Sequence, residues 1–210
     1  MMSCVLKNYK LDIKYIISLD KAPYNVISPF AFITITFMII FCSTIDFSEA
    51  QFFGHNIDLS NNKKSFDPQV AASGNNVYVA WRDETTGNGD IYVKASTDAG
   101  FNFTTTEKIS RDEGSSLRPQ ISAIGNKAYV AWTDSSSNNT EIFFQSSINN
   151  GENFYNTTNL SNDPILSYFP RMAVSGDNIY VVWNHGINLE NQDIYFKRIS
   201  EEYFKRNHIE

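Results

Sequence analysis

The chain has 210 residues, with 17 Lys and Arg, 23 Asp and Glu, and a net charge of −6. The first 50 residues hold four lysines and four acidic residues, so the whole negative charge belongs to residues 51–210. Because that part carries no basic cluster, its charge argues against nucleic acid or an anionic membrane surface as a partner. Both cysteines, Cys4 and Cys42, lie in the first 50 residues, so the remainder has no disulfide framework and no thiol chemistry.

Residues 26–45 form one uncharged apolar run, which lysines precede and acidic residues follow. That charge order predicts an N-terminal apolar helix, with the N-terminus inside the cell and the remainder of the chain outside. Ser48 and Ala50 are small residues at the −3 and −1 positions of a signal-peptidase site. We therefore expect residues 1–50 to be a signal peptide or, if uncleaved, a membrane anchor. Residues 51–210 are then secreted, or anchored with the folded part outside the cell.

The rest of the chain is built from a repeat of about 51 residues. Prolines and tryptophans mark the repeat at a constant spacing of 51 residues: Pro68, Pro119 and Pro170, and Trp81, Trp132 and Trp183. Self-similarity at a period of roughly 50 residues is typical of solenoids and propellers.

Each repeat predicts four short strands. In the first copy these are Gln69–Ser73, Val77–Trp81, Ile91–Ala95 and a polar, Thr-rich segment after Phe103. Val77–Trp81 is apolar on both faces, so we expect both faces to be covered, as in a sheet stacked between two others. Four-stranded units of this length are what a propeller blade requires. The sequence therefore predicts an all-β fold, a partial β-propeller of about three four-stranded blades.

The predicted blades occupy about 66–110, 117–161 and 168–204, and the third has a poor fourth strand. Residues 53–60 align with the fourth strands, so they predict an orphan outer strand before the first blade. Three blades are too few for a propeller ring, which usually has four to eight. Two chains arranged head to tail would complete each other's third blade, and we expect such a homodimer.

The turn between the third and fourth predicted strands carries the most specific motif. Its pattern, Ser-x-Asp-x-Gly-x-x-Phe, resembles the Asp-box of sialidase-like (BNR-repeat) β-propellers; the second copy has Asn for Asp, and the third copy lacks the pattern. Asp or Asn caps the turn, Gly supplies a positive φ, and the aromatic residue fills the hairpin. The resemblance implies a structural role, on the face opposite the family's active site. The motif positions are Ser96, Asp98, Gly100, Phe103, Ser147, Asn149, Gly151 and Phe154.

The resemblance to sialidases also implies an arginine triad, a Tyr and Glu pair and an acid/base Asp. The family's Arg-Ile-Pro motif is closest to Leu117-Arg118-Pro119, which lacks the intervening residue. Three blades in place of the family's six could not assemble the triad within one chain. We therefore expect a non-catalytic module that binds a glycan or a cell-surface protein through its loops. The alternatives are a sialidase-like glycoside hydrolase with a composite site, and a fragment of a longer repeat protein.

The loops between the second and third strands differ in every copy, whereas the strands persist, which is the usual division between scaffold and binding site. Cys and His residues show no zinc-binding spacing, and we expect neither a catalytic residue, a metal nor a cofactor. Candidate ligand-binding residues lie beside these loops and at the start of the first strands: Arg82, Asp83, Arg118, Asp134, Tyr168 and His185.

Overall fold

The computed structural model describes residues 54–111, 113–136, 139–188, 190–200 and 202–203. The chain divides into two units, Met1–Asn56 and Ile57–Glu210, and every strand found among the described residues belongs to the second. The apolar helix predicted over residues 26–45 lies outside the described residues. Within the described part, no helix has the length and apolar character needed to cross a bilayer.

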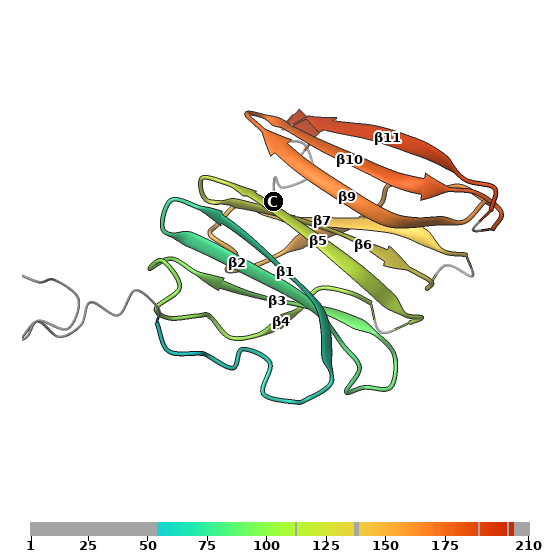
Figure 1. Ribbon diagram of the computed structural model, residues 1–210. Coiled ribbons are helices and arrows are strands. Elements are labelled where there is room, and N and C mark those ends of the chain that lie inside the picture. Colours follow the sequence, from blue (N-terminus) through green and yellow to red (C-terminus); the bar gives the residue numbers. More distant parts are fainter. Residues whose placement is uncertain (1–53, 112, 137–138, 189, 201, 204–210) are drawn as a thin grey trace, which may run out of the picture. The chain divides into compact units, whose positions relative to one another are not determined.

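The second unit consists of three antiparallel sheets (Figure 1). The first sheet has the strand order β1 (Ser65–Ser73), β2 (Asn76–Asp83), β3 (Asp90–Ser96) and β4 (Glu107–Lys108). The second has the order β5 (Ser116–Ile124), β6 (Lys127–Asp134), β7 (Glu141–Ser147) and β8 (Tyr155–Asn159). The third has the order β11 (Asp193–Ser200), β10 (Asn178–His185) and β9 (Ser167–Ser175).

This architecture confirms the all-β prediction, and three stacked sheets with one strand order are consistent with part of a β-propeller. The described residues bear on two details of the prediction, the poor fourth strand of the third blade and the orphan outer strand. The third sheet has three strands among the described residues, because the chain after β11 turns into a short helical segment at residues 202–203. Residues 54–60, the described part of the predicted orphan strand, form no strand, and residues 57–60, which belong to the second unit, lie beside the first sheet.

Each sheet begins with the same hairpin, which the sequence specifies directly. Two residues separate β1 from β2, β5 from β6 and β9 from β10, and the first of them is a glycine. Gly74, Gly125 and Gly176 have φ values of 60°, 59° and 54°. A type II′ turn requires a positive φ at this position, and its twist matches that of the flanking strands. Each turn therefore brings the first and second strands of its sheet into antiparallel register.

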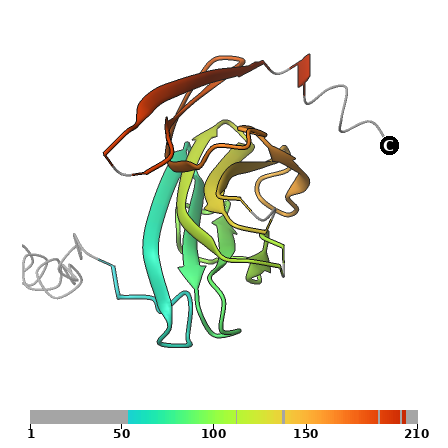
Figure 2. The same ribbon diagram turned by 90° about the vertical axis from the view of Figure 1, so that its right-hand side faces the viewer.

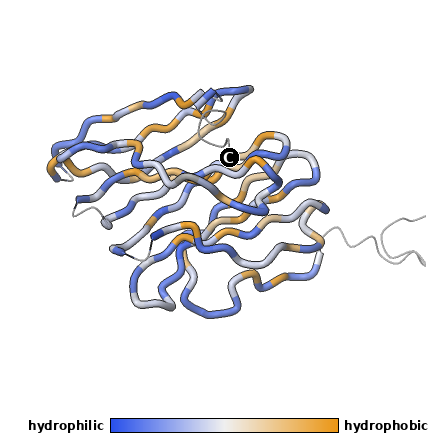
Figure 3. Tube along the Cα trace, turned by 180° about the vertical axis from the view of Figure 1, so that it is seen from behind, coloured by the Kyte–Doolittle hydropathy of each residue, from blue (hydrophilic) through white to orange (hydrophobic). Residues whose placement is uncertain are grey.

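The core lies in two layers, one on each side of the second sheet (Figures 1 and 2). Alternate residues of β6 contact opposite neighbours: Val130 and Trp132 belong to the cluster shared with the first sheet, and Tyr129 and Ala131 to the cluster shared with the third. Strand β6 is buried from Ala128 onward, and β7 is buried throughout. Hydrophobic residues accordingly gather on the strands, and hydrophilic residues on the connecting loops (Figure 3). The predicted cover on both faces is thus complete in the middle copy.

The repeated tryptophans are buried, as predicted. Trp132 is fully buried between the first two sheets, where its ring stacks on Phe143 at 6.2 Å between centroids. Its indole N–H donates a hydrogen bond to Asp134 at 2.8 Å. An indole ring is among the largest apolar groups that a core can bury, so this residue should contribute strongly to stability.

We predict that Trp132→Ala lowers the free energy of unfolding by about 3–5 kcal/mol, because it removes buried apolar surface and leaves a cavity. Denaturant unfolding monitored by circular dichroism measures this change. Phe101→Ala is the matched control, since the Phe101 side chain is 82% exposed and should change stability little. Equal unfolding midpoints for Trp132→Ala and the parent chain would contradict the packing described here.

Candidate functional site

The connections between the second and third strands, and between one sheet and the next, all emerge at one end of the three sheets. We call this end the loop face; it lies on the right-hand side of Figure 1. The first strands β1, β5 and β9 begin there. The hairpins that join the first strand to the second, and the third to the fourth, lie at the opposite end.

One residue of each first strand has an unusual backbone conformation near the loop face. Asp67, Arg118 and Phe169 have φ values of 53°, 53° and 60°, and each directly precedes one of the repeated prolines. In all three strands the register shifts at this point, as in a β-bulge. A non-glycine residue with positive φ costs roughly 1–3 kcal/mol, and such residues are concentrated at functional sites. These three positions are therefore the first candidates for function.

In the first sheet, the strained residue Asp67 belongs to a charged cluster. The guanidinium of Arg82 lies between two carboxylates, with its Nε 3.6 Å from Asp67 Oδ2 and an Nη 3.3 Å from Glu84 Oε1. The two carboxylate side chains are 43% and 41% exposed, so solvent and ligands can reach them. The Phe66 ring lies under the guanidinium, 4.8 Å from its central carbon. This arrangement presents two accessible carboxylates of fixed position.

Arg82 also has an unused hydrogen-bonding group. Its Nε–H is buried and has no hydrogen-bond acceptor among the described residues, although Asp67 is within ion-pair distance. A buried donor without an acceptor is energetically costly, so it favours any oxygen that can reach it. Because the Nε is buried, its compensation comes from the ion pair with Asp67, whose Oδ2 lies 3.6 Å away.

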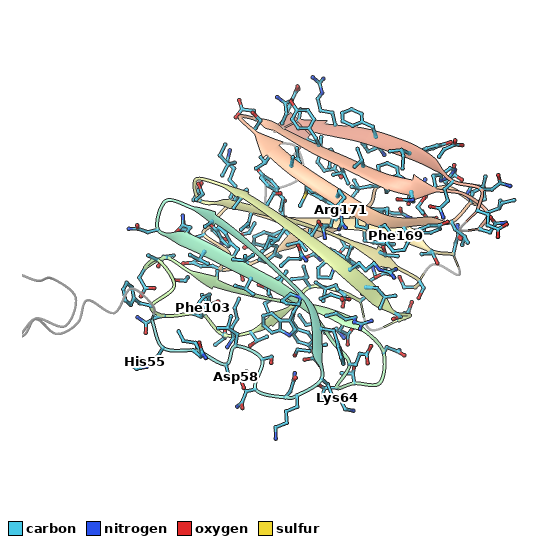
Figure 4. All side chains as sticks on the ribbon, in the orientation of Figure 1. His55, Asp58, Lys64, Phe103, Phe169 and Arg171 are labelled. Atoms are coloured by element: carbon cyan, nitrogen blue, oxygen red, sulfur yellow. The ribbon has the colours of Figure 1, made fainter. Side chains whose placement is uncertain are left out.

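The equivalent positions of the second and third sheets contact each other. The Arg118 guanidinium lies over the ring of Phe169, 4.0 Å from its centroid, and the Phe169 N–H donates to Thr133 Oγ1 at 3.3 Å. Figure 4 shows Phe169 on the side of β9 that faces β5. Tyr168 packs edge-on against Phe169 at 5.2 Å and donates its hydroxyl hydrogen to the Asn188 carbonyl at 3.0 Å. Arg118 and Tyr168, both predicted from the sequence, thus meet around Phe169.

Two other predicted residues, Asp83 and Asp134, are buried at the ends of β2 and β6. Asp134 accepts hydrogen bonds from the Ser116 hydroxyl at 2.7 Å, the Trp132 indole at 2.8 Å and the Ser136 N–H at 2.8 Å. Asp83 accepts equivalent bonds from the side chain and N–H of Thr85 and from the side chains of Asn62 and Ser65. Both carboxylates fasten their loops to their sheets.

The environment of Asp83 also affects its ionisation. Burial acts to raise the pKa of its carboxyl group, but the hydrogen bonds from Thr85, Asn62 and Ser65 outweigh burial and hold the pKa below its ordinary value. Asp83 is therefore a stable anion that is already satisfied within its own sheet.

His185 occupies the same position in the third sheet. Its Nδ1 lies 3.3 Å from the Ser167 hydroxyl, its Nε2 lies 3.8 Å from Asp163 Oδ1, and its ring stacks on Tyr195 at 4.0 Å. A pocket of about 330 Å³ opens beside it, lined in part by Ile165 and Tyr195. The predicted residues therefore fall into separate groups: Arg82 in the first sheet, Arg118 and Tyr168 around Phe169, and His185 at its own pocket. In the described part of the chain, no three His, Cys, Asp or Glu side chains come together as ligands for a metal ion.

Sequence reasoning assigned no role to Asp67 or Glu84. Asp67 differs from its repeat equivalents Arg118 and Phe169, and Glu84 resembles an ordinary turn residue. One signal was nevertheless present: each of the three divergent residues directly precedes a repeated proline. A proline interrupts the hydrogen-bond ladder of a strand, so the residue before it is a natural place for a bulge.

The hairpins that carry the Ser-x-Asp-x-Gly pattern lie at the end opposite the loop face. In the first sheet, Asp98 Oδ1 accepts the Asn102 N–H at 2.8 Å and the Ser96 hydroxyl at 2.7 Å, and Gly100 has a φ of 87°. The second hairpin repeats these bonds with Asn149 as the acceptor. Phe154 belongs to the core cluster between the first two sheets. These contacts are those of turn-capping residues.

No family model matches the chain, and no curated protein matches it. Among solved structures, the chain is similar to an α-L-arabinofuranosidase of Podospora anserina, with a TM-score of 0.45, 11% identity, and coverage of 72% of this chain and 51% of that one. It is also similar to an α-L-arabinofuranosidase of Fusarium graminearum (TM-score 0.46, 14% identity, coverage 68% and 48%). A third is a thermostable family-43 glycoside hydrolase (TM-score 0.44, 12% identity, coverage 66% and 49%). The chain spans about half the length of these structures.

These comparisons correct two predictions. The resemblance to sialidase-like, BNR-repeat propellers is wrong, because the similar structures are arabinofuranosidases and a family-43 hydrolase. The interpretation of the Ser-x-Asp-x-Gly pattern as an Asp-box is wrong for the same reason. The pattern describes a capped turn and does not identify a family. The prediction of a non-catalytic binding module is also wrong on this comparison, since the similar structures are glycoside hydrolases.

The hydrogen bonds around Asp98 predict a pH-dependent stability. The Asn102 N–H, followed by the Asn102 side-chain amide and the Ser96 hydroxyl, lowers the pKa of Asp98 from its ordinary value of 3.8 to about 2. A carboxyl group whose pKa is lower in the folded state stabilises the fold above the unfolded pKa, and this contribution is lost as the pH falls through the folded value. We therefore expect the stability difference between the parent chain and Asp98→Asn to be constant above about pH 4 and to shrink between pH 4 and 2.

Thermal melting from pH 6 to pH 2 measures this difference. Asn149→Asp is the matched variant, because it should introduce the same pH dependence into the second hairpin. A difference between the parent and Asp98→Asn that does not vary with pH would show that the Asp98 pKa is not lowered by folding.

Proposed function

We propose that the loop face of this chain acts on a glycan, with Asp67 and Glu84 as the carboxylate pair that cleaves a glycosidic bond. The observation that carries this proposal is the placement of two accessible carboxylates on either side of Arg82, at a strained bulge of the first strand. Hydrolysis of a glycosidic bond needs two carboxyl groups, one as general acid and one as base or nucleophile.

The separation of the two carboxylates suits this chemistry. Both contact the same guanidinium, at 3.6 Å and 3.3 Å, so they lie less than roughly 10 Å apart. Carboxyl groups of glycosidases are about 5–5.5 Å apart in retaining enzymes and about 6.5–9.5 Å apart in inverting ones. The shared guanidinium thus sets an upper limit on the separation of the pair, and this limit is compatible with either mechanism.

Their places in the fold assign different roles to the two residues. Asp67 lies on β1, where the bulge and the following proline restrict its backbone, so it suits the base or nucleophile, which needs a fixed position. Glu84 lies just after β2, at the start of the loop, and takes the role of the acid, which requires its carboxylate to leave the ion pair with Arg82 and bind the proton that it gives to the leaving oxygen. Arg82 orients both carboxylates through its ion pairs with them.

Aromatic rings on the same face can receive the apolar side of a sugar ring. Phe66 lies beside the carboxylate pair, and Phe169 lies at the equivalent bulge of the third sheet. Ligand sites commonly combine such rings with a few convergent polar groups. The proposed function is supported by this geometry and not by the likeness to arabinofuranosidases, of whose length the chain covers about half.

Turnover of aryl glycosides tests the proposal, with an aryl α-L-arabinofuranoside included in the panel. We expect hydrolysis above a heat-denatured control, reduced at least about 100-fold in Asp67→Asn and in Glu84→Gln, because each removes a general acid, a base or a nucleophile. Glu190→Gln is the matched control, since Glu190 is an exposed carboxylate on the loop between β10 and β11. Full activity in both site variants, or no turnover on any glycoside of the panel, would refute the assignment.

A further inference from the structure

The third sheet has an open edge at β11. Its strand order is β11-β10-β9, whereas the first two sheets continue beyond the equivalent strands β3 and β7 to a fourth strand. Two apolar residues of β11, Ile194 and Phe196, are 68% and 62% exposed. After β11 the described chain leads toward β8, where the Tyr203 hydroxyl lies 2.9 Å from Thr158 Oγ1. Among the described residues, none pairs with the outer edge of β11.

In the first sheet, a two-residue unit after β4 closes this edge. The Ile109 N–H donates to the Ile91 carbonyl at 2.9 Å. The Ser110 hydroxyl accepts the Ile91 N–H at 3.0 Å and donates to the Asp90 carboxylate at 3.0 Å. The unit therefore satisfies both backbone groups of Ile91 and the acidic side chain before it.

The second sheet uses the same unit. The Leu160 N–H donates to the Ile142 carbonyl at 2.7 Å, and the Ser161 hydroxyl accepts the Ile142 N–H at 2.9 Å and bonds to Glu141. Ile194, with the exposed Asp193 before it, is the equivalent residue of the third sheet. By analogy with the first two sheets, the backbone of Ile194 and the carboxylate of Asp193 need an apolar residue followed by a serine.

The chain contains that pair at the other end of the stack. Leu59-Ser60 lies 50 residues before Ile109-Ser110, in a segment, Ile57–Ser60, that follows the repeat. This segment lies against the outer face of the first sheet, where it lines a pocket of about 250 Å³ with Val79 and Trp81. It forms no strand within the described chain, and Ile57 is largely exposed. The segment therefore lies against the first sheet in the same way as the chain after the fourth strand of the first sheet lies against the second sheet.

The outer faces of the first and third sheets, which pack on no other sheet among the described residues, also resemble the two halves of an interface that the chain already contains. Residues of β6 contact the first sheet, and the equivalent residues of β10 contact the second sheet. The same repeat positions of β2 lie on the outer face of the first sheet. In chain order these positions hold Val77, Val79 and Trp81, then Ala128, Val130 and Trp132, then Ile179, Val181 and Trp183.

The outer face of the third sheet supplies the complementary half. Tyr180 and Phe196 stack there with 6.2 Å between centroids, as Tyr129 and Phe144 stack at 6.2 Å on the face by which the second sheet contacts the third. The outer face of the third sheet therefore resembles the face of the second sheet on which the third sheet packs. The outer face of the first sheet resembles the face of the third sheet that packs there, so the two outer faces are complementary.

We propose that a second copy of this chain joins these faces: Ile57–Ser60 of one copy forms the fourth strand beside β11 of the other, and the outer face of the first sheet packs on the outer face of the third. The Leu59 N–H then donates to the Ile194 carbonyl, and Ser60 accepts the Ile194 N–H and bonds to Asp193. Strand addition at an open edge supplies main-chain hydrogen bonds, and each copy offers both halves of the contact, so two copies can close on each other. This assembly does not depend on the proposed hydrolytic function.

Light scattering during gel filtration of the full chain tests the assembly. We expect twice the mass of one chain for the parent protein and the mass of one chain for Phe196→Glu, which places a charge in the interface. Phe101→Glu is the matched control, because Phe101 is also an exposed aromatic residue but lies in the hairpin between β3 and β4, and it should leave the dimer intact. A monomeric parent, or a dimer that Phe196→Glu leaves intact, overturns the proposal. A monomer whose melting temperature falls in Phe196→Glu would show that the face is covered within one chain, which also overturns it.

A disulfide tests the strand register directly. Tyr92 of β3 and Lys108 of β4 are paired across the first sheet, and the corresponding residues of the proposed pair are Tyr195 and Asp58. In a chain with both native cysteines replaced by serine, we expect Asp58→Cys and Tyr195→Cys chains, when mixed, to form a cross-linked dimer under mild oxidation. Each variant alone should remain uncrosslinked, as should a mixture of Asp58→Cys with Phe101→Cys. No cross-link in the first mixture, or equal cross-linking in both mixtures, overturns the proposed register.

Discussion

The structure depends on the packing of one apolar sheet face against another. Each second strand has large side chains on both faces, and the middle sheet buries both of them. Because burial of apolar area is the main favourable term in folding, a single sheet of this composition would expose too much apolar surface to remain folded alone. Stability therefore comes from the contacts between neighbours, as in other repeat proteins, and not from any one blade.

This dependence separates the two ends of the molecule. The end with the type II′ turns and capped hairpins is built from glycine, asparagine and serine, which satisfy their own backbone groups. At the loop face, buried Asp83 and Asp134 fasten the loops to their sheets. The bulge residues Asp67, Arg118 and Phe169 are therefore free to differ from one copy to the next. The fastening residues Asp83 and Asp134 and the variable bulge residues thus lie side by side on one face.

The repeat of tryptophans and prolines predicted the sheets well, because periodic burial leaves a direct trace in the sequence. The cluster of Asp67, Arg82 and Glu84 could not be predicted, because it forms through a register shift between β1 and β2 that periodicity alone does not show. The hairpin motif pointed to the wrong family for a related reason. A serine, an acidic or amide side chain and a glycine form a capped turn wherever a hairpin needs one, so the pattern reports local chemistry and not ancestry.

The bulge before each proline has a consequence for how such a protein can change. The proline and the register shift set the backbone, so the side chain at that position contributes little to the strand itself. The three copies accordingly carry an acid, a base and an aromatic ring on the same backbone position: Asp67, Arg118 and Phe169. Duplication of a repeat therefore also duplicates this backbone position and the direction of its side chain. A single substitution there can then change the chemistry of the loop face without changing the fold.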